Sequence, residues 1–262
     1  MIECIQIQSH SKTYHVKSLQ RLRIARPNHF KHAQVLRGRP CAVPISMHIS
    51  RMPRNCSNPF KLPFWGHYSP AQWDENPDLA KWCRTHQMGW DVTDYGEGDF
   101  AKRGLILFCL RNGILRQPGE VPYAEKIMIV GENQECPWHY HKVKMEDIIV
   151  RGGGNLVIEL CNLTDDGKMD MVNDVHVRTD GKLNILPAGG KVVLEAGQSV
   201  TLPRTLVHRF YGEEGKGPVI VGEVSQVNDD LADNFFFDCD ARFSEIENDV
   251  APIHPLWNEL AS

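Results

Sequence analysis

Residues 137–147, with the sequence PWHYHKVKMED, combine a strand-like pattern with side chains that bind metal ions. His139 and His141 are two positions apart, so on a β-strand both side chains point to the same face. Lys144 and Glu146 share a face by the same rule, and a tight turn at 142–143 would fold this pair against the histidines. Two imidazoles and one carboxylate would then form a three-ligand face for a divalent cation, leaving coordination positions open for a substrate.

A second stretch, residues 197–208 with the sequence GQSVTLPRTLVH, offers a fourth ligand. Pro203 and Arg204 are expected to turn the chain, so that His208 opens a strand directed back into the interior. We therefore expect His139, His141, Glu146 and His208 to bind one metal ion.

The chain around these stretches predicts many short strands separated by turns rich in Gly, Asn and Asp. Such spacing is typical of an antiparallel sandwich or barrel. A helical segment should precede the strands. It begins at Ser69-Pro70 and carries Trp73, Leu79, Trp82 and Cys83 roughly on one face. The strands are expected at 105–110, 125–130, 138–141, 144–150, 156–161, 174–179, 192–195, 199–202, 207–211 and 219–224.

Charge divides the chain into two parts. Residues 1–60 contain ten Lys and Arg and one acidic residue, whereas the rest contains 19 basic and 32 acidic residues. We interpret residues 1–58 as a poorly ordered basic extension, with a start-site artefact or a transit peptide as alternatives, and residues 59–262 as the folded domain. An acidic domain would repel phosphate, so nucleic acid is not an expected partner.

Apolar runs such as 105–110 are far shorter than the roughly 20 residues that cross a bilayer, so no membrane association is expected. The eight cysteines form no CxxC pair and have irregular spacings. This pattern does not indicate a disulfide framework and favours the cytoplasm as the location.

The two motifs resemble those of the cupin family, which implies an all-β, jelly-roll type of antiparallel barrel. Two positions depart from the cupin pattern, because Asn133 and Thr205 stand where glycines are expected. From about residue 60 to residue 258, the chain further resembles the D-lyxose isomerases, a family of metal-dependent cupin sugar isomerases. The segments that carry this resemblance are 88–96, 122–128, 144–149, 151–156, 201–203, 208–210, 222–225 and 228–230.

The resemblance implies aldose–ketose isomerisation between D-lyxose and D-xylulose, with D-mannose and D-fructose as a further pair. It also implies Mn²⁺ as the metal, with Co²⁺ or Fe²⁺ as alternatives. The positions matching His139, His141, Glu146 and His208 bind the metal in that family, and the lysine matching Lys144 points into the sugar pocket. A homodimer is expected because open cupin barrels have sheet edges to cover.

Isomerisation moves a proton from C2 to C1 and therefore needs a base. Glu146, as a metal ligand, would be a poor free base, although it belongs to the catalytic centre. Lys144 could stabilise an oxyanion or carry a proton. Glu247 is the favoured base, with Glu245 as its alternative, although both could belong to a solvated acidic tail. Contacts to sugar hydroxyls are expected from Lys126, Glu223 and Arg242.

Two other functions fit the same ligands. Three histidines and one glutamate also suit Fe(II), so a cupin dioxygenase is one alternative. The other is a sugar-binding cupin without catalysis. Lys144 beside the ligands favours an enzyme.

Overall fold

The computed structural model of the chain describes residues 62–239 and 252–261, together with the backbone of 6–8 and 46–48. The predicted boundary between residues 58 and 59 lies outside the described residues and stays a prediction.

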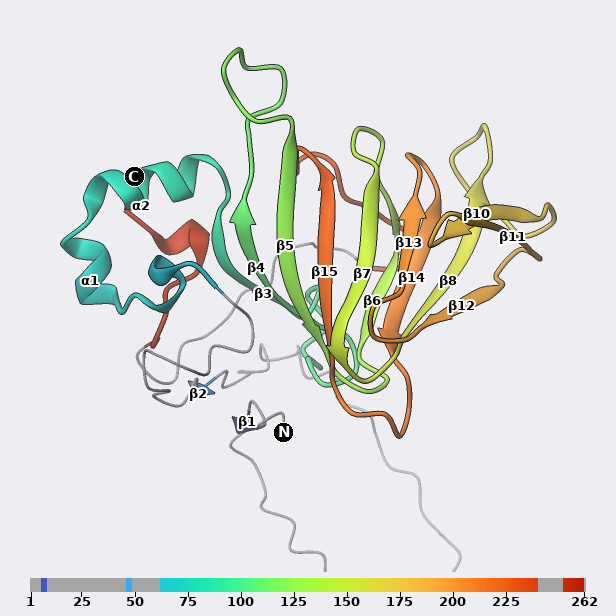
Figure 1. Ribbon diagram of the computed structural model, residues 1–262, viewed down its shortest axis with the longest axis horizontal. Helices are drawn as coiled ribbons and strands as arrows, with labels where there is room; N and C mark the ends of the chain where they lie inside the picture. Colours follow the sequence, from blue (N-terminus) through green and yellow to red (C-terminus); the bar gives the residue numbers. More distant parts are fainter. Residues whose placement is uncertain (1–5, 9–45, 49–61, 240–251, 262) are drawn as a thin grey trace, which may run out of the picture.

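Two curled antiparallel sheets face each other and form the barrel (Figure 1). The first has eight strands in the order β11-β10-β13-β7-β15-β5-β4-β3, and the second has the order β12-β8-β14-β6-β16. The strands are β3 (Gly89–Thr93), β4 (Leu105–Arg111), β5 (Tyr123–Val130), β6 (Glu135–Tyr140), β7 (Glu146–Gly153), β8 (Leu156–Leu163), β9 (Met169–Asp170), β10 (Val175–Thr179), β11 (Lys182–Leu186), β12 (Lys191–Leu194), β13 (Ser199–Leu202), β14 (Val207–Gly212), β15 (Val219–Gln226) and β16 (Phe235–Phe236). Two further strands, β1 (Gln6–Gln8) and β2 (Ser46–His48), pair with each other.

The helical segment precedes the barrel, as predicted. It comprises η1 (Phe64–His67), α1 (Pro70–Asp74) and α2 (Pro77–Thr85), and a short helix η2 (Trp257–Glu259) lies near the C-terminus. Pro70 occupies the first helical position of α1, and the Ser69 backbone N–H donates to the Gln72 side chain. Of the residues expected roughly on one helical face, Trp73 and Cys83 are buried, whereas Trp82 is 53% exposed and stacks on His86.

The two largest of the three hydrophobic clusters among the described residues hold these layers together. The larger one fills the space between the sheets and is built from inward-facing residues such as Val130, Ile148 and Val221. The smaller one joins the helical segment to the outer face of β3 and β4, where Trp65 and Trp90 pack on Phe108. The cupin-type all-β fold with an N-terminal helical segment is thus confirmed.

Alternation along the strands positions the polar side chains inside the barrel. On β5, the buried residues are Ala124, Lys126, Met128 and Val130, so Lys126 shares the face of the apolar core. Among the described residues, no helix has the length and apolar character needed to cross a membrane.

Candidate active site

Three histidines meet between the two sheets. His139 in β6 is paired with His208 in β14, and His141 follows β6 directly. All three side chains are buried, and one ring nitrogen of each lies within 4.8 Å of those of the others. Backbone register therefore brings together ligands that are about 70 residues apart in sequence.

Each imidazole is fixed by a backbone carbonyl. A carbonyl oxygen only accepts hydrogen bonds, so each Nδ1 carries the proton and each Nε2 presents a lone pair. This arrangement is typical of metal-binding histidines, whose second nitrogen is held by an outer partner. The Nδ1 atoms donate to the carbonyls of Pro137, Asp233 and Leu206, at 2.7 Å from His139, 2.5 Å from His141 and 2.9 Å from His208, respectively.

Glu146 completes the group from the opposite sheet. Its Oε1 lies 3.5 Å from Nε2 of His141 and 3.2 Å from Nε2 of His208, and neither nitrogen has a hydrogen-bond partner. Lone pairs of two buried imidazoles thus face a carboxylate oxygen, an arrangement of acceptors that a shared cation would satisfy. The three histidines could hold a metal ion, and this donor set fits a divalent one.

Lys144 joins the ligand group to a second carboxylate. Its Nζ lies 2.9 Å from Glu146 and 2.9 Å from Glu223. Glu223 lies on β15 directly opposite Lys126 on β5, and its Oε1 also accepts a hydrogen bond from Ser225. A buried ammonium therefore lies between a ligand carboxylate and a carboxylate of the pocket.

Burial and charge act in opposite directions on these groups. Burial alone would raise the pKa of Glu146, but the Lys144 ammonium holds this pKa well below its usual range. Burial also favours neutral Glu223, yet Lys126 and Lys144 lower its pKa. Burial lowers the pKa of Lys144, and the two carboxylates reverse this effect, so that its pKa is above the ordinary value. At neutral pH these groups are charged.

In His139 and His141, burial determines the direction of the pKa shift. Burial is the main reason that the pKa of His139 lies well below its usual value, and the neighbouring His208 and His141 add to this effect. Burial followed by the Lys144 ammonium lowers the pKa of His141. Both rings are therefore neutral near pH 7, which is the form that binds metals.

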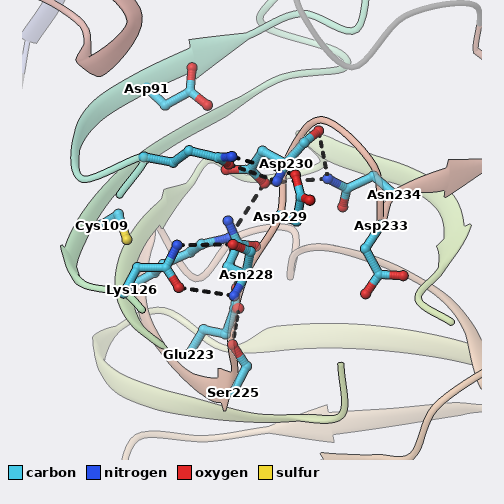
Figure 2. A network of polar contacts seen from close by, with 12 residues as sticks. Asp91, Cys109, Lys126, Glu223, Ser225, Asn228, Asp229, Asp230, Asp233 and Asn234 are labelled. Atoms are coloured by element: carbon cyan, nitrogen blue, oxygen red, sulfur yellow. Dashed lines mark hydrogen bonds and ion pairs between the residues drawn. The ribbon is translucent and has the colours of Figure 1, made fainter. Parts of the chain in front are cut away.

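A second group of polar side chains adjoins this ion pair (Figure 2). Nζ of Lys126 lies 2.6 Å from Oδ1 of Asn228, which accepts its hydrogen bond, and 3.6 Å from Asp230. Oδ1 of Asn228 also accepts from Lys144 at 3.4 Å. Asn228 and Asp230 come from the segment after β15, residues 228–234, which we call the Asx strap.

The cavity between these groups is lined by both polar and apolar side chains. It encloses about 400 Å³ of empty space, counting its opening to solvent. Its polar wall comprises Lys126, His139, His141, Lys144, Glu146, Glu223, Asp230 and Asn234. Its apolar wall comprises Tyr95, Leu105, Leu107, Met128, Cys136, Ile148, Phe210 and Phe236.

The two non-glycine departures from the cupin motifs keep a backbone conformation that normally favours glycine. Asn133 has a φ of 55° and Thr205 a φ of 65°. Thr205 closes the turn before β14, where its N–H donates to the carbonyl of His141. The turn geometry is thus retained, and the β-branched Thr205 is held in a strained region.

The structure places most of the expected site residues in one volume. His139, His141, Glu146 and His208 converge, and Lys144, Lys126 and Glu223 face the same cavity. Glu247, its alternative Glu245 and Arg242 lie outside the described residues. Sequence reasoning assigned no role to Asn228, Asp230, Asp233 and Asn234, although the dense run of Asn and Asp after β15 is a signal that could have found them.

Comparison with known proteins adds the family. A family model described as D-lyxose isomerase matches residues 45–260. The chain belongs to the D-lyxose isomerase family. The D-lyxose/D-mannose isomerase of Serratia proteamaculans is 48% identical over 205 residues, covering 76% of this chain and 87% of the relative. The D-lyxose/D-mannose isomerase of Escherichia coli O157:H7 is 44% identical over 201 residues, which cover 76% of this chain and 88% of the relative.

The family match shows that the chain is an isomerase of the aldose–ketose class. The residues matched by the family model begin at 45, before the expected boundary at 58. Solved structures are more distant. The L-ribose isomerase of Cellulomonas parahominis with L-ribose has a TM-score of 0.44 and 17% identity, covering 70% of this D-lyxose isomerase family member and 98% of that chain. The L-ribose isomerase of Geodermatophilus obscurus has a TM-score of 0.43 and 16% identity, and the match covers 76% of this chain and 98% of that chain.

Proposed function

We propose that the chain interconverts D-lyxose and D-xylulose, and D-mannose and D-fructose, in a metal-dependent reaction. The observation that carries this proposal is the position of the Lys144–Glu223 ion pair in the cavity wall, where Glu146 links it to the unpaired Nε2 atoms of His141 and His208. The naming of both relatives as D-lyxose/D-mannose isomerases supports the choice of sugars.

His139, His141, His208 and Glu146 would hold the metal, with Mn²⁺ expected and Co²⁺ or Fe²⁺ as alternatives. When bound, a divalent ion polarises the sugar carbonyl and its neighbouring hydroxyl, which lowers the barrier to proton removal by several kcal/mol.

The chain's own residues supply the proton transfer. Glu223 is buried, ionised and not among the proposed ligands, so its carboxylate can take the proton from C2 and return it to C1 through an enediol. Lys144 holds this carboxylate in place and donates to the oxygen that acquires negative charge. Glu247, the base expected from sequence, remains a competing candidate.

The far side of the pocket would bind the sugar chain. Lys126, Asp230 and Asn234 combine donors and acceptors in the polar wall, as hydroxyl recognition requires. The apolar wall around Met128 and Phe236 would exclude water from the reacting carbons.

The experiment is isomerisation of D-lyxose in D₂O by the Mn²⁺-loaded protein, followed by NMR. Proton transfer predicts D-xylulose with deuterium at C1, whereas an intramolecular hydride shift leaves C1 without deuterium. A panel of other aldoses defines the substrate. The absence of ketose from every aldose would overturn the proposal. Oxygen uptake by an iron-loaded sample would then favour the dioxygenase, and sugar binding without turnover would favour a binding protein.

The expected homodimer and the cytoplasmic location stay predictions. The five described cysteines, Cys83, Cys109, Cys136, Cys161 and Cys239, are all free thiols, in line with the absence of a disulfide framework in this part of the chain.

A further inference from the structure

The turn between two of the proposed ligands is bound by one buried side chain. Residues 142–145 connect His141 to Glu146, and the backbone N–H groups of 142–144 donate to Asp233 in the Asx strap. Asp233 is 4% exposed and is drawn beside Asn234 in Figure 2. It is not part of the cavity wall described above, so its role concerns the turn rather than the sugar.

Both oxygens of the Asp233 carboxylate are engaged. Oδ1 accepts from the N–H of Lys142 at 2.8 Å and from that of Val143 at 3.0 Å. Oδ2 accepts from the N–H of Lys144 at 2.9 Å and from that of Val143 at 3.2 Å. Three successive N–H groups around one anion form a backbone nest, which fixes the path of the turn.

The backbone of Asp233 acts on the ligands as well. Its carbonyl accepts the 2.5 Å hydrogen bond from Nδ1 of His141, and its N–H donates to the carbonyl of Asp229 at 3.0 Å. One residue therefore orients a ligand imidazole through its main chain and the Lys144 backbone through its side chain. The same strap provides Asn228, which contacts the ammonium groups of both pocket lysines.

We propose that Asp233 is a positioning residue that sets the turn between His141 and Glu146, and with it the place of the Lys144 ammonium and the affinity of the metal site. Without the carboxylate, three N–H groups lose their partners and the turn relaxes toward solvent. The ligands remain present but are no longer held in one geometry, and loss of such outer contacts lowers metal affinity or activity about 10- to 100-fold.

The inference rests on the proposed metal-dependent isomerase, and its test has one readout that does not depend on turnover. Asp233→Asn keeps one acceptor oxygen for the turn, whereas Asp233→Ala keeps none. Asp170→Asn is the matched control, because Asp170 accepts from the N–H groups of Val172 and Asn173 on an exposed turn away from the site. Mn²⁺ affinity is measured by competition with a chromogenic chelator. The kcat and KM for D-lyxose are measured from initial rates at saturating Mn²⁺.

We expect Mn²⁺ affinity and kcat to fall about 10- to 100-fold in Asp233→Ala, less in Asp233→Asn, and not at all in the control, with KM within about threefold of wild type. A melting temperature measured without metal separates folding from positioning. If both Asp233 variants melt lower but keep wild-type Mn²⁺ affinity and kcat, Asp233 is merely structural and the proposal is overturned. If the wild-type protein isomerises no aldose, the proposed function fails, while the Mn²⁺ titrations still decide the role of Asp233.

Discussion

Replacing Lys144 with methionine tests the charge balance of the pocket. The Lys144 side chain is 3% exposed, and its Nζ lies 2.9 Å from each of the carboxylates of Glu146 and Glu223. Methionine retains most of the apolar length but removes the ammonium. Two buried carboxylates then share one fewer counter-ion, since only Lys126 stays beside Glu223, at 3.7 Å.

Breaking a buried ion pair by removing one partner costs about 3–5 kcal/mol. For a domain of this size, each kcal/mol corresponds to roughly 2–4 °C, so the metal-free Lys144→Met protein should melt about 6–20 °C below wild type. Added Mn²⁺ should recover part of this loss if Glu146 is a ligand, because the ion replaces the missing positive charge. Turnover should fall about 10²- to 10⁴-fold, even at saturating metal.

The loss should also depend on pH. In the wild type, the folded-state pKa of Glu146 lies below its unfolded value, so its stabilising contribution is present above that unfolded value and disappears as pH falls through the folded pKa. In Lys144→Met, burial without the ammonium should raise the pKa of Glu146 above its unfolded value, and the variant then loses stability as pH rises. The difference in unfolding free energy should therefore be largest near pH 7 and shrink toward pH 4.

Lys168→Met is the control, because Lys168 is 77% exposed and forms a surface ion pair with Asp166. Its melting temperature should stay close to that of the wild type, because solvent screens an exposed ion pair. The measurements are thermal melts with and without Mn²⁺ at several pH values, and initial rates with D-lyxose. Equal melting temperatures for Lys144→Met and wild type without metal would refute the reasoning, since they would mean that the two carboxylates tolerate the loss of their shared ammonium.

Three further changes probe separate parts of the site. His208→Ala should abolish Mn²⁺ binding and turnover, whereas His176→Ala on strand β10 should change neither; metal analysis and rate measurements would show this. Glu223→Gln should retain Mn²⁺ but lower kcat about 10²- to 10⁴-fold, and an unchanged kcat would transfer the role of base to another residue, with Glu247 next to be tested. Thr205→Gly should remove the strain of a left-handed backbone conformation, which costs about 1–2 kcal/mol for a non-glycine residue. The extra freedom of glycine in the unfolded chain partly offsets this effect, so chemical denaturation should show that the free energy of unfolding rises by up to about 1 kcal/mol.

The ligand set could be expected from sequence because it depends on local spacing and one long-range register. Two residues on one strand, as in His139-x-His141, share a face whatever the rest of the fold does. The pairing of His208 with His139 then follows from antiparallel strands that meet in the same sheet. Lys144 also lies where its spacing from Glu146 placed it, although β7 begins only at Glu146.

Other elements have no comparable local signal. Strand β3, Gly89–Thr93, is buried along its whole length, so its sequence GWDVT shows no alternation of apolar and polar residues. Strand β11 lies at a sheet edge and leaves Leu183 and Ile185 exposed, which hides the usual inward pattern. The strap residues Asn228 and Asp233 resemble ordinary turn formers in sequence, and only tertiary contacts reveal that they hold Lys126, Lys144 and His141.

Charge pairing within the pocket bears on the choice of substrate. Both ammonium groups, those of Lys126 and Lys144, already lie within 3.7 Å of carboxylates from Glu146, Glu223 and Asp230. Two cations against three carboxylates leave the described pocket with an excess of negative charge, which a divalent ion would reverse. A phosphate dianion would find no unpaired ammonium among these side chains, whereas a neutral sugar needs no counter-ion. Negative charge that develops on the sugar oxygens during proton transfer would then meet a site whose sum has become positive, so stabilisation acts on the reacting state more than on the bound substrate.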